Sequence, residues 1–250
     1  MKNVIYILVL SLLVACNGEN VPDCFQNAGD IIQQEITVEA FDKITVFERI
    51  ELIVTDVPSQ QVTVETGKYL LNDIEVKVEN GRLILINNNA CNLTRDYGIT
   101  KVYVSSPNLT EIRNSSGLTM RSNGILNYTS LLLVSEDFNS PEVTHTDGDF
   151  DVQVNSDRLR IVVNNLSNIF ISGAVNDLTI GFYSGNVRFE GANLIAQNIN
   201  IFQRSSNDMI INPQQSLTGE IRSTGDVISL NRPPIVDVQE FYTGKLIFRD

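Results

Sequence analysis

The chain has 250 residues, of which 42% are hydrophobic and 19% charged, and its formal net charge is −12. This acidity argues against nucleic acid and against anionic lipid headgroups as partners, because both require a basic face. No apolar run after the N-terminal one reaches the 18 residues or more that a membrane-spanning helix takes.

The first fifteen residues have the order of a bacterial lipoprotein signal peptide. Lys2 supplies the positive charge, residues 4–14 are apolar, and Ala15 precedes Cys16. We therefore expect cleavage after Ala15 and acylation of Cys16, so that the chain contacts the membrane through lipid alone. No charged residue directly follows Cys16, which favours an outer-membrane lipoprotein, on either the periplasmic or the outer face.

The rest of the chain divides at Glu35. Residues 16–34 are polar and interrupted by glycine and proline, which predicts a lipidated tether, and residues 35–250 are expected to form a single domain. Two further cysteines, Cys24 and Cys91, would lie in a compartment where disulfides persist. The sequence leaves two alternatives open: the two cysteines form a disulfide bond, or they are two unrelated thiols.

From Glu35 onward, short runs alternate apolar and polar residues, which is typical of half-buried strands. In the second half, pairs of strands recur: Leu178, Ile199, Leu217 and Val236 begin units that are 21, 18 and 19 residues apart. This period predicts an all-β, right-handed β-helix (solenoid) with coils of about 20 residues. A β-sandwich is the alternative, because its strands also recur at short intervals.

In the solenoid interpretation, alternate residues of these units face inward and outward. The predicted inward ladder is Leu178, Ile180, Ile199, Ile201, Leu217, Ile221, Val236 and Val238. The predicted outward residues are Thr179, Asn198, Asn200, Thr218, Glu220, Asp237 and Gln239.

The strand motifs of the first half occur in a fixed order: FDKITV (41–46), IELIV (50–54), VTV (62–64), VENGRLILI (78–86) and PNLTEI (107–112), the last leading to Ser115, Ser116 and Gly117. Over about residues 38–230, this order resembles the putative auto-transporter adhesin head domain, or GIN domain, of Gram-negative envelope lipoproteins. The resemblance implies a β-helical fold on a lipid or membrane anchor, with a role in surface adhesion or envelope organisation. It implies no catalytic residues.

Chemistry-bearing residues are few. His145 is the single histidine, so a Ser-His-Asp triad would have to include it, yet it lies in an alternating strand and turn where an exposed histidine is ordinary. We predict no catalytic residue and no cofactor. Asp147, Asp149 and Asp151 offer oxygen ligands that suit calcium. The plainer interpretation of this segment is a turn entering a strand with Phe150, Val152 and Val154 inward.

We therefore expect a non-enzymatic, lipid-anchored envelope protein that presents a β-helical surface to a glycan or protein partner. A self-assembling scaffold is the alternative, because the ends of stacked coils are open strand edges that copies of the chain can share in a homo-oligomer. A polysaccharide-degrading β-helix ranks third. The acidic and basic residues that such an enzyme would gather in a groove are Asp149, Asp151, Asp157, Arg158 and Arg160, and the candidate sugar-stacking rings are Tyr183, Phe202 and Tyr242.

Overall fold

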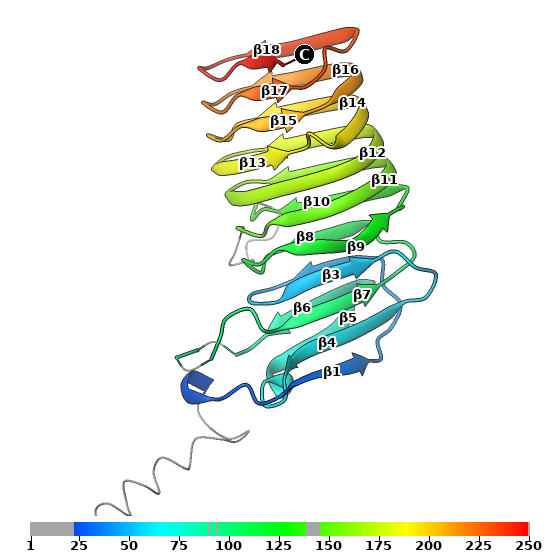
Figure 1. The fold of residues 1–250 in the computed structure, drawn as a ribbon, viewed down its shortest axis with the longest axis vertical. Helices are drawn as coiled ribbons and strands as arrows, with labels where there is room; N and C mark the ends of the chain where they lie inside the picture. Colours follow the sequence, from blue (N-terminus) through cyan, green and yellow to red (C-terminus); the bar gives the residue numbers. More distant parts are fainter. Residues whose placement is uncertain (1–22, 90, 94, 139–145, 250) are drawn as a thin grey trace, which may run out of the picture.

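The computed structural model describes residues 23–89, 91–93, 95–138 and 146–249. These residues form a single connected set of nineteen strands and two short 3-10 turns, η1 (Asp23–Phe25) and η2 (Leu71–Asp73), without any α-helix. The predicted all-β class is confirmed. No helix in this part of the chain is long and apolar enough to cross a membrane. Figure 1 shows the strands stacked along one axis, with β1 near one end and β18 at the other.

The strands are β1 (Ile31–Ile36), β2 (Lys43–Val46), β3 (Glu51–Thr55), β4 (Gln61–Gly67), β5 (Ile74–Glu79), β6 (Arg82–Asn87), β7 (Lys101–Ser105), β8 (Glu111–Asn114), β9 (Met120–Leu126), β10 (Ser130–Ser135), β11 (Phe150–Val163), β12 (Leu166–Phe182), β13 (Asn186–Glu190), β14 (Leu194–Gln203), β15 (Met209–Ile211), β16 (Pro213–Ile221), β17 (Val227–Ser229), β18 (Ile235–Glu240) and β19 (Leu246–Phe248).

Strands one coil apart pair in parallel. β12 pairs with β14, β14 with β16 and β16 with β18, so that Leu178, Ile199, Leu217 and Val236 are direct neighbours in that order. This is the pairing that stacked coils require. It does not suit the β-sandwich alternative, whose sheets are antiparallel. The hand of the coil stays a prediction.

The long strands β11 and β12 turn a corner and contribute to two ladders each. Residues 150–154 of β11 pair with β9 and with the first half of β12, whereas residues 158–163 pair with β10 and with the second half of β12. The corner needs glycine at Gly173, where φ is +110° and an added Cβ would lie 2.0 Å from the Val154 carbonyl oxygen. Each coil therefore presents two sheet faces that meet at this corner.

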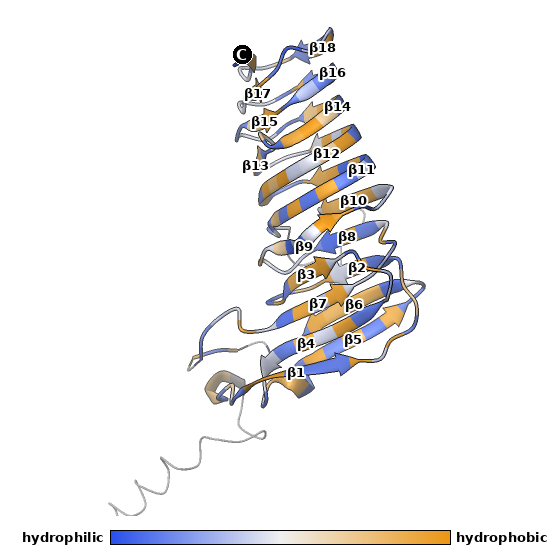
Figure 2. Ribbon diagram, turned by 45° about the vertical axis from the view of Figure 1, so that its right-hand side comes forward, coloured by the Kyte–Doolittle hydropathy of each residue, from blue (hydrophilic) through white to orange (hydrophobic). Residues whose placement is uncertain are grey.

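The alternation of the sequence places the core inside the coils, and Figure 2 shows it as stripes of hydrophilic and hydrophobic colour along β11. The inward residues of the middle coils, such as Leu178 and Leu217, are buried. The predicted outward residues are exposed, except that Thr218 and Glu220 are half-buried.

One member of the predicted inward ladder, Val236, is exposed. Val236 is 41% exposed, because β18 lies at the end of the stack and pairs, among the described strands, with β16 alone. Ile221 pairs with Gln203, while the neighbour of Ile201 is Gly219. Leu217, Gly219 and Ile221 keep the two-residue alternation, and Ile221 is fully buried, as predicted.

The first half of the chain does not stack in sequence order. β2 lies between β6 and β8, and β3 lies between β7 and β9. The antiparallel strands β1, β4 and β5 then complete this end of the stack. The segment at 23–34, predicted as tether, therefore takes part in the fold: β1 begins at Ile31, and Cys24 is joined to Cys91 with an S–S distance of 2.07 Å. The predicted signal and Cys16 lie outside the described residues.

Truncation of the stacked ladder tests this core. Leu217 is fully buried between Ile199 and Val236, so Leu217→Ala should lower the free energy of unfolding by about 2–5 kcal/mol. Thr179→Ala, at an exposed outward position, should change it by less than about 0.5 kcal/mol. Urea denaturation of both variants measures the difference, and equal losses would contradict the assigned faces.

Candidate ligand-binding groove

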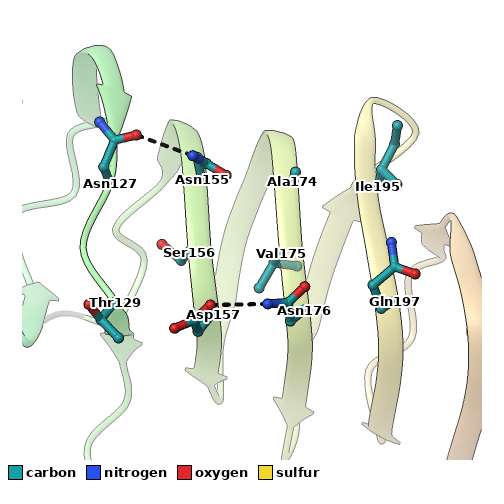
Figure 3. A pocket seen from close by; sticks show the side chains of 10 residues that line it. All are labelled: Asn127, Thr129, Asn155, Ser156, Asp157, Ala174, Val175, Asn176, Ile195 and Gln197. Carbon is teal, nitrogen blue, oxygen red and sulfur yellow. Dashed lines mark hydrogen bonds between the residues drawn. The ribbon is translucent and has the colours of Figure 1, made fainter.

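A groove with a volume of about 230 Å³ crosses four neighbouring chain segments on the outside of the corner. Its walls come from the connection between β9 and β10, from β11, from β12 and from β14, which Figure 3 shows side by side. The lining residues are Asn127, Thr129, Asn155, Ser156, Asp157, Ala174, Val175, Asn176, Ile195 and Gln197.

The surface is hollow here because a small side chain lies between larger ones. Asn155, Ala174 and Ile195 are register neighbours on β11, β12 and β14. The methyl group of Ala174 leaves a depression between the amide of Asn155 and the side chain of Ile195, which is 49% exposed. The shape thus follows from the residue sizes at one register position.

The groove is polar and close to neutral. Asn155 Nδ2 donates a hydrogen bond of 3.4 Å to Asn127 Oδ1, and Asn176 Nδ2 donates one of 3.0 Å to Asp157 Oδ1 (Figure 3). Asp157 is the single charged residue among those that line the groove. The amides and hydroxyls that line the groove can donate hydrogen bonds to a ligand and accept hydrogen bonds from it.

Part of this hydrogen-bonding capacity is unused by the protein. The side chains of Thr129 and Gln197 form no hydrogen bond with any other residue that the structure describes. Ser156 is 8% exposed, and its buried hydroxyl has no partner within the same residues. Because this oxygen is buried, the unused hydrogen-bonding groups that a ligand can reach are those of Thr129 and Gln197.

Polar ladders continue from the groove along the outer sheet face. Asn198 Nδ2 donates to Asp177 Oδ1 at 2.9 Å, and Ser216 Oγ donates to Asn198 Oδ1 at 2.8 Å. One register step along, Asn200 Nδ2 donates to Thr218 Oγ1 at 2.9 Å. These hydrogen bonds join side chains on neighbouring strands, so they hold the polar side chains of the outer face in place relative to one another.

A row of rings lies at the far edge of the same face. Tyr183 stacks on Phe202 with ring centroids 5.1 Å apart, and Phe138 meets Tyr183 edge to face at 6.2 Å. The guanidinium of Arg222 lies 5.9 Å from the centroid of Phe202 and 4.1 Å from that of Phe241. Two of the three predicted sugar-stacking rings thus contact each other, and the third, Tyr242, directly follows Phe241.

The acidic candidates are not brought together as a metal site. Asp149 accepts a 2.6 Å hydrogen bond from the backbone of Asn168, and Asp151 forms a 2.7 Å ion pair with Arg121. The described part of the chain holds no group of three or more His, Cys, Asp or Glu residues suited to a metal ion. The predicted inward residues of this strand, Phe150, Val152 and Val154, are buried. His145 lies outside the described residues.

The residues considered for a polysaccharide-degrading site are dispersed. Asp157 lines the groove, whereas Asp151 belongs to the other ladder of β11 and Asp149 directly precedes that strand. Arg158 and Arg160 follow on the outer face of β11 and do not line the groove. Sequence reasoning missed the groove itself. Its one available signal was the small Gly173–Ala174 pair within an otherwise long strand.

Tyr128 supports the first wall of the groove. Its buried hydroxyl donates a 2.8 Å hydrogen bond to the Ser106 carbonyl, and the neighbouring Asn127 backbone donates one of 2.7 Å to Asp56. Burial, and to a smaller extent the Asp56 carboxylate, raise the pKa of the Tyr128 phenol well above its usual range. The folded protein therefore favours the neutral phenol.

These features define an all-β protein with an exposed, polar outer face. Residues 40–233 match the family described as putative auto-transporter adhesin, head GIN domain, and the chain belongs to this family. The resemblance seen in the sequence is thereby confirmed. No curated protein matches the chain.

Solved structures with similar folds come from the genera Bacteroides and Parabacteroides. A putative adhesin from Bacteroides fragilis NCTC 9343 is 17% identical, with 88% of this chain and 97% of that one covered and a TM-score of 0.77. A putative lipid binding protein from Parabacteroides distasonis ATCC 8503 is 14% identical, with 89% and 98% covered and a TM-score of 0.63. A putative adhesin from Parabacteroides merdae ATCC 43184 is 15% identical, with 94% and 98% covered and a TM-score of 0.55. At these identities the likeness establishes the fold alone.

Tyr128→Phe tests the support of the groove wall. Loss of the hydrogen bond to Ser106 should cost about 1 kcal/mol of stability at neutral pH. The unfolded phenol ionises above about pH 10 while the folded one stays protonated, so the wild-type contribution is complete below that pH and is lost as pH rises. Above pH 10, wild-type stability should fall more steeply than that of the variant, by about 1.4 kcal/mol per pH unit. Parallel pH profiles in urea denaturation would contradict the assignment.

Proposed function

We propose that this protein is a non-enzymatic lipoprotein of the bacterial outer membrane whose outer sheet face binds a glycan or protein partner in surface adhesion. In this proposal the coils form a right-handed β-helix, and acylated Cys16 is the membrane contact. The observation that carries the proposal is the outer face itself: a polar surface fixed from coil to coil by the Asp177–Asn198–Ser216 hydrogen bonds, with a groove at one edge.

The position of the anchor supports a binding role. η1 and β1, the first described elements after Cys16, lie at the opposite end of the stack from β18 (Figure 1). Lipid attached at Cys16 would therefore hold that end near the membrane and leave the later coils farther away. A rigid stack on a short tether suits the presentation of a face to a partner.

The groove does not favour the enzyme alternative. Most glycoside hydrolases use two carboxyl groups on opposite sides of the scissile bond. Asp157 is the one carboxylate that lines this groove, and the Asn176 amide donates to it. The arrangement suits binding of a ligand better than its hydrolysis.

A self-assembling scaffold remains a second candidate because of the last described coil. β18 pairs with β16 and β19 with β17, and neither has a second neighbour among the described strands. Ile235, Phe241 and Tyr242 are more than half exposed at this end. An unpaired edge with apolar side chains is a surface on which chains can associate.

Replacing the lipidated residue tests the anchor. With the full chain produced in a Gram-negative host, Cys16→Ser should abolish incorporation of labelled palmitate and leave a secreted or uncleaved product, because the substitution removes the thiol that receives the lipid. Cys91→Ser serves as a control that removes a different cysteine and should keep the label. Label retained by Cys16→Ser would contradict the anchor.

Sedimentation velocity separates adhesion from self-assembly. The adhesion proposal expects a monomer across a hundredfold range of protein concentration in detergent. If the protein is a self-assembling scaffold, association should rise with protein concentration. It should be lost in Ile235→Lys, which places a charge on the exposed edge strand β18. Asp237→Lys, on the same strand, controls for the added charge.

A further inference from the structure

The geometry assigns a ligand class to the groove, and we infer that it binds a neutral carbohydrate. This inference rests on the proposed binding function and narrows it to one site and one chemistry. Three observations carry it: the charge of the lining residues, their unused hydrogen-bonding groups, and the small apolar floor at Ala174 and Ile195.

The charge of the groove excludes strongly anionic ligands. None of the lining residues is Lys, Arg or His, and Asp157 contributes one negative charge. The whole chain carries a formal net charge of −12, so its long-range field also repels anions. Sulfated, phosphorylated or carboxylated sugars would find no cationic partner there.

The polar groups match hydroxyl-rich ligands. A sugar hydroxyl donates one hydrogen bond and accepts others, so it pairs with side chains that carry both functions. Thr129 and Gln197 carry both functions and form no side-chain hydrogen bond within the described residues. Ligand hydroxyls at Thr129 and Gln197 would use hydrogen-bonding groups that the described part of the protein leaves unpaired.

The apolar floor suits the C–H face of a sugar ring. Ala174 is exposed and Ile195 is half-exposed, and the two are direct neighbours on β12 and β14. The groove's volume of about 230 Å³ is below that of a drug-sized pocket, so the groove suits a small part of a sugar chain. The outer-face ladder from Asp177 to Ser216 can then contact further residues of a longer chain.

A protein ligand fits this groove less well. Added-strand binding needs an unpaired sheet edge, but β11, β12 and β14 are each paired on both sides. Protein hot spots are mostly large aromatic or arginine anchors in deep desolvated pockets. The shallow floor of Ala174 and Ile195 provides no such pocket.

The test compares two substitutions of the same kind on one strand. Ala174→Arg fills the depression, and Thr179→Arg adds the same side chain to an exposed position of β12 outside the groove. The full chain, purified in detergent, would be screened on an array of neutral and anionic oligosaccharides. Affinities for the bound compounds would then be measured by isothermal titration calorimetry.

We expect binding to neutral oligosaccharides, a loss of at least tenfold in Ala174→Arg, and a change of less than twofold in Thr179→Arg. Gln197→Ala, which removes one hydrogen-bonding group without filling the groove, should weaken binding by about three- to tenfold. Asp157→Asn, which keeps the shape and removes the charge, should retain neutral-sugar binding within about tenfold. Circular dichroism confirms that each variant is folded.

Other outcomes overturn the inference and separate it from the proposed function. Binding to anionic glycans alone, or neutral-glycan binding that Ala174→Arg leaves intact, would refute the groove as a neutral-sugar site. Adhesion to cells through a protein partner, without glycan binding, would also refute it while leaving the adhesion proposal in place. Absence of both glycan binding and cell adhesion would refute both.

Discussion

In-register stacking of apolar side chains between successive coils is the interaction on which the other features of this structure depend. Leu178, Ile199 and Leu217 are each buried against the equivalent residue of the neighbouring coil. Because strand side chains alternate between faces, this register also fixes which residues point outward. The polar ladders and the groove are therefore consequences of the same parallel pairing that buries the core.

The groove shows how a small change in residue size shapes the surface of such a scaffold. Neighbouring coils repeat the same backbone position, so a surface feature arises where one coil carries a shorter side chain than the next. At the corner, Ala174 lies between Asn155 and Ile195, and Gly173 permits the backbone to turn there. A rigid backbone with variable outward residues is suited to acquiring binding sites without loss of the core.

Alternation and period were sufficient to predict the class of fold and most of the inward and outward residues from Leu178 onward, because they reflect the pleat of each strand. They were insufficient for the first half. A strand pattern does not encode which strands pair, so the position of β2 between β6 and β8 was not visible. Val236 was misplaced because β18 lies at the end of the stack and has, among the described strands, a neighbour on one side alone. The groove was missed because it depends on residues from four segments, which only the coil register brings together.

The central claim, that coils about 20 residues long stack in parallel register, is tested most directly by one distance in solution. Arg160, Thr179, Asn200, Thr218 and Asp237 are successive register neighbours, so Arg160 and Asp237 are four strand spacings apart. Double electron-electron resonance between nitroxide labels at Arg160→Cys and Asp237→Cys, in a Cys16→Ser background, measures this separation. The account predicts a narrow distribution around a backbone separation of about 19 Å. A broad distribution, or one centred beyond about twice that value, would contradict the stacked coils.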